Sequence, residues 1–153
     1  MWRRFTNGRI QDLDLHSLTI TKVNSINAIQ MMSPEITITK DYNLVEPKEG
    51  INFREIRRAI ARLFYASGIP EKNGIWVFRE GQQNVSYDDL YRLKELIKEN
   101  YPKDVKINKT AIVIKSGFQS KTAKYFKQIA EDLPFEIQVF SDFQAAEDWL
   151  KNN

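Results

Sequence analysis

Residues 109–150, KTAIVIKSGFQSKTAKYFKQIAEDLPFEIQVFSDFQAAEDWL, contain the pattern that decides the fold. The run 110–114 is a short, continuous apolar stretch, as expected of a strand that is buried on both faces. A helix is expected over 120–132, a second strand over 136–140 and a last helix directly after it. Strands that alternate with helices in this way predict a parallel sheet with helices on its faces, which is the α/β class.

The residues upstream extend the same pattern toward the N-terminus. A helix is expected to begin after the capping residue Asn52, and another over 86–97. Between these helices, 74–78 is a short apolar strand bounded by turn residues. Two runs, 36–39 and 44–47, flank a turn and predict a hairpin at the start of the domain.

Composition limits the chemistry that the chain can perform. The 153 residues are 42% hydrophobic and 28% charged, and the net charge of +3 comes from basic and acidic side chains that interleave along the chain. This balance is typical of one globular domain and does not indicate nucleic-acid binding. The chain has no cysteine and one histidine, so we expect no disulfide, no thiol nucleophile, no metal site and no other cofactor.

The N-terminal third differs from the rest of the chain. Few turn signals interrupt its residues, whereas strand and helix patterns alternate regularly from Ile36 onward. We therefore expect an N-terminal extension over 1–34 and a single domain over 35–153. No apolar run approaches the ~20 residues of a spanning helix, and the first residues lack the layout of a secretory signal, so a cytoplasmic protein without stable membrane insertion is expected.

Ser141 and Asp142 stand where the last strand gives way to the last helix. A Ser-Asp pair at a sheet edge is either a reactive pair or a helix start. Gln144 lies three residues after Ser141, which is the spacing of a capping box, and no base or phosphate loop accompanies the pair. The sequence therefore favours Ser141 as a helix cap over a catalytic role.

The C-terminal stretch KTAIVI…FKQIAEDLPFEIQVFSDFQAAEDWL resembles the end of the SpoIIAA-like domains, relatives of the STAS (sulfate transporter and anti-sigma-factor antagonist) fold. In those bacterial proteins a strand that ends in Phe and an Ala-rich helix that closes in Trp-Leu finish the domain. The order of elements matches over about 36–151. The resemblance implies a four-to-five-stranded, mostly parallel sheet with an antiparallel edge hairpin, about four helices, and a regulatory or binding module without catalysis.

Ser86 is the residue at which the resemblance bears on regulation. The anti-sigma antagonist branch has a phosphorylatable serine at the start of the helix after the central strand, and Ser86 is the nearest hydroxyl here. This sequence lacks the Asp-Ser-Ser-Gly pattern of that branch. Ser86 and Asp89 also have the spacing of a capping box, so a cap is favoured and a phosphosite or partner-binding role is the alternative.

Two basic groups are further candidates for binding. A loop before the third helix contains a glycine, two serines and two lysines that suit an anion or another ligand, although it lacks the spacing of a P-loop: Lys115, Ser116, Gly117, Ser120 and Lys121. The first helix has Arg54, Arg58 and Arg62 four residues apart, which suits an acidic partner; a solvated face shared with Glu55 is the alternative.

The function expected from these observations is non-catalytic binding of an unidentified protein or of a small ligand, with a homodimer left open. The alternative is a carrier of a lipid or other small apolar ligand. Aromatic residues are numerous enough to line a pocket between helices and sheet, and the lipid-transfer CRAL-TRIO domains share this superfold. An enzyme is least favoured, because no nucleophile and base stand in a recognisable pattern.

Overall fold

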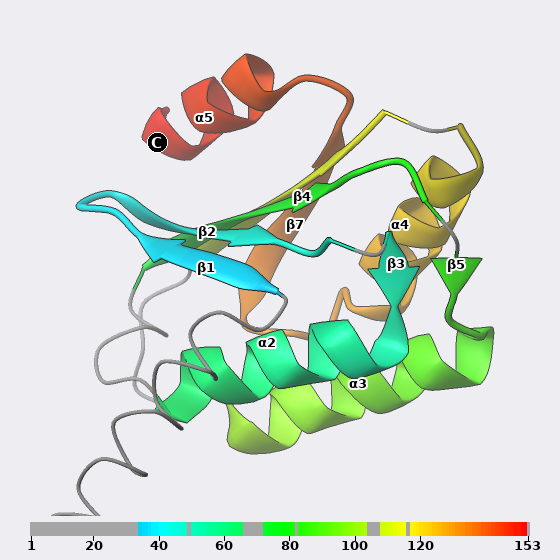
Figure 1. Ribbon diagram of the computed structural model, residues 1–153. Coiled ribbons are helices and arrows are strands. Elements are labelled where there is room, and N and C mark those ends of the chain that lie inside the picture. Colours follow the sequence, from blue (N-terminus) through cyan, green and yellow to red (C-terminus); the bar gives the residue numbers. More distant parts are fainter. Residues whose placement is uncertain are drawn as a thin grey trace, which may run out of the picture. The chain divides into compact units, whose positions relative to one another are not determined.

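The computed structural model describes residues 34–48, 50–65, 72–81, 83–103, 108–115 and 117–152 of the chain. These residues belong to one compact unit, Ser33–Asn153. Its elements follow the predicted alternation of strands and helices (Figure 1). Residues 1–33, which make up nearly all of the predicted extension, lie outside the described residues, so the extension stays a prediction.

A five-stranded sheet forms the centre of the unit. Its strands are β1 (Glu35–Ile38), β2 (Tyr42–Glu46), β4 (Asn73–Phe78), β6 (Asn108–Ile114) and β7 (Phe135–Phe140), in the order β1-β2-β4-β6-β7. β1 and β2 pair antiparallel as the predicted hairpin, and the other three pairs are parallel. The mostly parallel sheet with an antiparallel edge is therefore confirmed.

A second sheet of two short strands was not predicted. β3 (Ile51–Asn52) and β5 (Gln83–Asn84) pair in parallel. Strands of this length show no alternation of polar and apolar residues, and β5 lies between the expected strand over 74–78 and the expected helix over 86–97. Gly50, with a φ of 75°, leads the chain into β3 through the left-handed conformation that glycine adopts readily.

Four helices of the described residues cover the sheet: α2 (Phe53–Tyr65), α3 (Tyr87–Asn100), α4 (Gly117–Ile129) and α5 (Phe143–Lys151). Figure 1 shows α5 on one side of the sheet and α2 and α3 on the other. Side chains of α4 share a core cluster with those of α2 and α3, so α4 belongs to the same layer. None of these described helices is long and apolar enough to cross a membrane.

Local caps set the helix starts, and one was predicted wrongly. Asn52 caps α2 as predicted, since its side-chain oxygen accepts from backbone amides of the first turn. At α5 the N-cap is Asp142 and not Ser141, because the Asp142 carboxylate accepts from the Ala145 amide at 2.9 Å. A carboxylate makes the stronger, charge-assisted bond and suits the positive end of a helix. The expected Ser141–Gln144 capping box is therefore absent.

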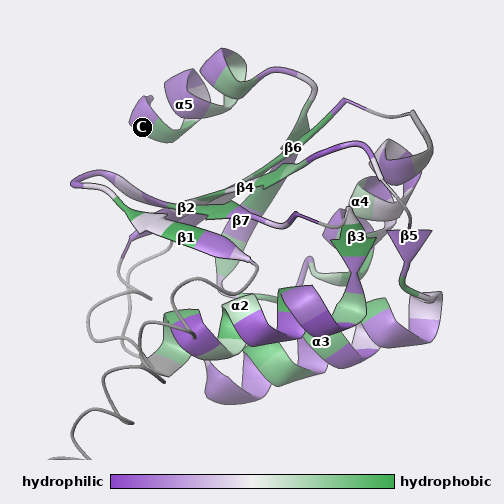
Figure 2. Cartoon of the chain, in the orientation of Figure 1, coloured by the Kyte–Doolittle hydropathy of each residue, from purple (hydrophilic) through white to green (hydrophobic). Residues whose placement is uncertain are grey.

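The two faces of the sheet are packed differently. On one face, α5 places Ala146 and Leu150 against Ile75, Ala111 and Val113, and all five are buried. The small alanines bring the helix close to the strands. On the other face, larger side chains of the strands meet those of α2, α3 and α4. Figure 2 shows the largely hydrophobic strands between these two helical layers.

Polar contacts also tie α5 to the sheet. The Tyr42 hydroxyl donates to the Glu147 carboxylate at 2.6 Å. This hydrogen bond, together with burial and the negative charge of Glu147, raises the pKa of Tyr42 to about 12. The Lys109 ammonium donates to the Trp149 carbonyl oxygen at 3.1 Å and lies over the Trp149 ring. It thereby satisfies a carbonyl group in the last turn of the helix.

We predict that Tyr42→Phe lowers the free energy of unfolding by about 1–2 kcal/mol near neutral pH, because a hydrogen bond to a carboxylate is lost. The folded state favours the protonated phenol, so this contribution is complete below the unfolded pKa of about 10 and is lost as the pH rises to about 12. Urea denaturation of both proteins at about pH 8 and about pH 11.5 measures the difference. A difference that stays the same at both pH values would contradict the assignment.

Candidate functional site

A cavity of about 160 Å³ lies between the sheet and the layer formed by α2, α3 and α4. Its lining side chains come from all three helices and from the strands β2, β4, β6 and β7. Most of them are aliphatic or aromatic. One face of the sheet therefore borders an apolar cavity, whereas α5 covers the other face.

Strand register divides the floor of this cavity into two rows. Asn43, Gly74 and Thr110 are partners across β2, β4 and β6 and form a row that is small or polar. The next row on the same face is apolar and contains Val45, Trp76 and Ile112. Because side chains alternate between faces along each strand, the two rows lie side by side inside the cavity.

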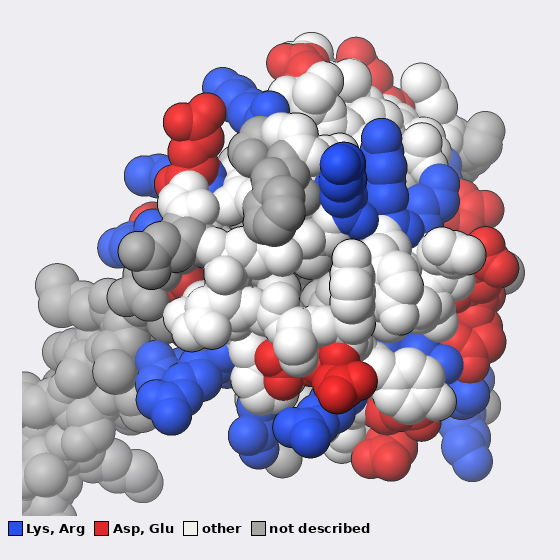
Figure 3. Space-filling model, turned by 90° about the vertical axis from the view of Figure 1, so that its right-hand side faces the viewer, with Lys and Arg blue, Asp and Glu red and all other residues white. Residues whose placement is uncertain are grey.

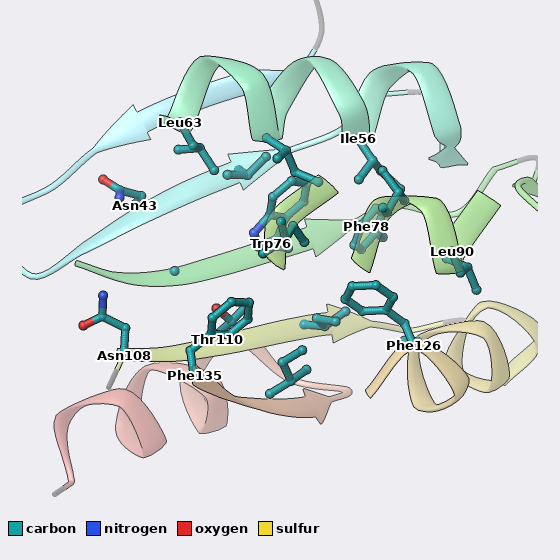
Figure 4. Close-up of a pocket in the computed structure, with 18 of the residues that line it drawn as sticks. Asn43, Ile56, Leu63, Trp76, Phe78, Leu90, Asn108, Thr110, Phe126 and Phe135 are labelled. Atoms are coloured by element: carbon teal, nitrogen blue, oxygen red, sulfur yellow. The ribbon is translucent and has the colours of Figure 1, made fainter. Parts of the chain in front are cut away.

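The apolar row continues into an apolar end of the cavity. Figure 4 shows Phe78, Leu90 and Phe126 at this end, contributed by β4, α3 and α4. Phe78 stacks on Trp76 with ring centroids 6.2 Å apart. A ligand body at this end would contact hydrocarbon and aromatic rings.

The opposite end of the cavity is polar. Figure 4 places Asn43 and Asn108 there, contributed by β2 and β6, the strands on either side of β4. Asn108 Nδ2 donates to the Tyr101 hydroxyl at 3.3 Å. Burial raises the pKa of Tyr101, so its hydroxyl stays protonated at neutral pH. Lys72 also lines the cavity, and its ammonium donates to the Thr39 carbonyl oxygen at 2.8 Å.

Sequence reasoning anticipated the apolar part of this site and missed the polar part. A surplus of aromatic residues indicated a pocket between helices and sheet, and Trp76, Phe78 and Phe126 do line the cavity. Asn43 was assigned to the hairpin turn, whereas it lies in β2 and is buried. Asn43 and Gly74, a polar residue and a glycine inside neighbouring strands, were the sequence signal for the polar end of the cavity.

Ser86 is the N-cap of α3. Its hydroxyl accepts from the Asp89 amide at 3.1 Å, and the Asp89 carboxylate accepts from the Ser86 amide at 2.9 Å. That second bond holds the pKa of Asp89 below its usual range. The predicted capping box is confirmed. Ser86 is exposed, and the phosphosite alternative stays a prediction.

The candidate anion loop, residues 115–121, includes the first turn of α4. α4 begins at Gly117, three residues earlier than expected, so Ser120 and Lys121 lie within the helix. Lys115 and Lys121 are exposed, and Ser116 lies outside the described residues. Figure 3 views the side that holds β5 and α4, where charges of both signs surround an uncharged centre. Anion binding at this loop stays a prediction.

The arginine row on α2 is divided between two environments. Arg54 and Arg58 are exposed, whereas Arg62 is half-buried and donates to the Pro34 carbonyl oxygen at 2.7 Å. Glu55, which we expected on the same solvated face, is buried, and its carboxylate accepts from the backbone of the segment before α2. An acidic partner for this face stays a prediction, and Arg62 has a structural contact of its own.

One comparison with known proteins identifies the fold. The crystal structure of an uncharacterised DUF3478-family protein with a SpoIIAA-like fold, from Shewanella loihica PV-4, matches 77% of this chain and 92% of its own, with 20% identity and a TM-score of 0.52. The domain has a SpoIIAA-like fold. No family model and no curated protein matches the chain. The likeness therefore establishes the SpoIIAA-like architecture and assigns no role to any residue.

We predict that the two faces of the SpoIIAA-like sheet respond differently to the same substitution. Ala146→Leu forces a larger side chain into the α5 contact and should lower the free energy of unfolding by about 1–3 kcal/mol. Ala123→Leu extends into the cavity and should change it by less than about 1 kcal/mol. Urea denaturation of both variants provides the comparison. Equal losses would show that the cavity face is as closely packed as the α5 face.

We also predict that Ser86→Ala lowers the free energy of unfolding by about 1 kcal/mol, the usual effect of losing an N-cap. Ser86→Asp should retain most of that stability, because a carboxylate also caps a helix. Chemical denaturation of the two variants and of the unchanged protein tests this. If alanine has no effect, the hydroxyl has a role other than capping.

Proposed function

We propose that the domain is a non-catalytic binding module that holds a small apolar molecule in the cavity between the sheet and the α2–α4 layer. The observation that carries this proposal is the cavity itself, which is lined mostly by aliphatic and aromatic side chains. Small-molecule sites have this composition, with a few polar groups that fix the orientation of the ligand.

The volume limits the size of the ligand. An engineered apolar cavity of roughly 150 Å³ accommodates a benzene molecule. The cavity of this domain, at about 160 Å³, therefore suits a body of about one ring or a short branched chain. It is smaller than the roughly 300–1,000 Å³ of sites for drug-sized ligands. Between the two expected classes of apolar cargo, this size favours a small molecule over a long-chain lipid.

The lining also favours binding over catalysis. Among the described residues that line the cavity, Lys72 and Tyr101 have titratable side chains, and the other described ones are apolar or neutral. A general acid–base mechanism needs a group that changes its protonation state near the working pH and lies beside the reacting atom. Tyr101, whose pKa is raised by burial, does not meet that requirement at neutral pH, and the Lys72 ammonium donates to the Thr39 carbonyl oxygen.

A protein partner is the second candidate function. Tyr87 and Tyr91 on α3 are 65% and 53% exposed, unusually high values for large aromatic side chains. Tyr87 also contacts the Tyr125 ring of α4, with centroids 4.4 Å apart. Exposed tyrosines are enriched at protein interfaces, because one side chain offers both apolar area and a hydroxyl group.

We predict that toluene raises the melting temperature of the domain. A ligand at ten times its dissociation constant adds about 1.4 kcal/mol of stability, which corresponds to about 3–6 °C for a chain of this size. Differential scanning fluorimetry with increasing toluene measures the shift. Ala123→Leu is the matched control, because it occupies the cavity and should abolish the shift while the domain stays folded. No shift in the unchanged protein would reject the cavity as a site for a neutral hydrocarbon of this size.

A further inference from the structure

Two hydrogen-bond donors meet over Gly74 in the polar row of the cavity. A Cβ atom placed on Gly74 would lie 3.9 Å from Trp76 Nε1 and 3.9 Å from Thr110 Oγ1. The third neighbour, at 4.0 Å, is the backbone oxygen of Asn43 in the adjacent strand. Since glycine has no side chain, this position has room for one methyl-sized group, and an indole N–H and a hydroxyl border it.

Both of these side chains have hydrogen-bonding capacity left for a ligand. Neither Trp76 Nε1 nor Thr110 Oγ1 makes a hydrogen bond to another described residue. Figure 4 shows the indole nitrogen of Trp76 directed toward the end of the cavity that holds Asn43 and Asn108. A tryptophan N–H can only donate, so an atom that it binds must be an acceptor.

Lys72 adds a positive charge to the same lining. Its ammonium group uses one of three N–H donors on the Thr39 carbonyl oxygen. None of the ion pairs of the described residues includes Lys72. A half-buried ammonium beside an apolar space has lost part of its hydration, so an anion there would be favourable.

We propose that the ligand of this cavity is a small organic acid in its ionised form. Its carboxylate lies at the polar end, within reach of the Lys72 ammonium, the Trp76 indole N–H and the Thr110 hydroxyl. Its apolar body, of about one ring, extends over Ile112 toward Phe78. This inference rests on the proposed function, because it assigns the chemical class of ligand to the same cavity.

The arrangement selects against other classes of ligand of the same size. A ligand amine would face the Lys72 ammonium without a described carboxylate to offset the repulsion. A neutral hydrocarbon would leave the indole N–H and the hydroxyl without partners, which disfavours the complex relative to one that satisfies them. One cation and two neutral donors match the two oxygens and single charge of a carboxylate.

The test compares three ligands of matched shape, namely benzoate, benzamide and toluene. Isothermal titration calorimetry or protein NMR at about neutral pH gives the dissociation constants, and benzoate is fully ionised there. We expect benzoate to bind the unchanged protein at least about 10-fold more tightly than benzamide. Lys72→Met should remove that preference and leave toluene binding unchanged, because methionine keeps the apolar stem of the side chain without its charge.

Gly74→Ala provides a second variant that does not depend on charge. The added methyl group makes ordinary contacts of 3.9–4.0 Å, so the domain should fold normally. It occupies the space between the two donors, and we expect benzoate affinity to fall about 10-fold while the toluene shift persists. The matched control is Lys124→Met, which removes the same charge from an exposed position on α4 and should leave the benzoate preference intact.

The outcomes separate this inference from the proposed function. If toluene binds and benzoate shows no preference over benzamide, the carboxylate assignment is wrong and the apolar cavity remains a binding site. If the preference survives in Lys72→Met, the anion lies elsewhere, and the assignment is again wrong. If neither toluene nor benzoate binds, the proposed function itself fails.

Discussion

The structure depends on the burial of β6 on both faces. Parallel strands need long connections, and the helices in those connections cover the two faces of the sheet. Along β6 the side chains alternate in size, with Ala111 and Val113 facing α5 and with Ile112 and Ile114 facing the other layer. The small residues let α5 pack directly on the sheet, whereas the bulkier Ile112 and Ile114 line the cavity beneath α2, α3 and α4.

The register of the β2–β4 and β4–β6 strand pairs produces the polar end of the cavity. Asn43, Gly74 and Thr110 lie near the amino ends of β2, β4 and β6, and parallel pairing brings them into one row. Ligands of open α/β sheets usually bind beyond the carboxyl ends of the strands, where our sequence-based candidate loop lies. This SpoIIAA-like domain instead offers hydrogen-bond donors inside its core at the opposite ends. The proposed ligand therefore lies between layers and does not rest on a loop.

The sequence was sufficient for the main sheet and the helices but not for the two-stranded sheet or the site, for physical reasons. Apolar periodicity predicted the sheet and helices, because each pattern is local and repeats over several residues. The predicted N-cap of α5 was wrong by one residue. Ser141 and Asp142 can both cap a helix, and only the folded structure shows which of them does. The polar row combines residues from three separate strands. Each of these residues, taken alone, is typical of a turn or a strand. That they lie side by side can be predicted only when the pairing of the strands is known.

The energetic cost of the cavity supports a functional role. A closed, unfilled core cavity costs roughly 24 cal/mol per Å³. A closed space of about 160 Å³ would therefore cost ~4 kcal/mol, and this cavity, which is partly open to solvent, costs less than that. Domains of this size have only about 5–15 kcal/mol of net stability. Single substitutions would recover part of this stability, since Ala123 and Gly74 both border the space and a larger side chain at either position would extend into it. A fold that keeps small residues at both positions maintains room that a ligand can fill, and binding there would stabilise the whole domain through the same contacts.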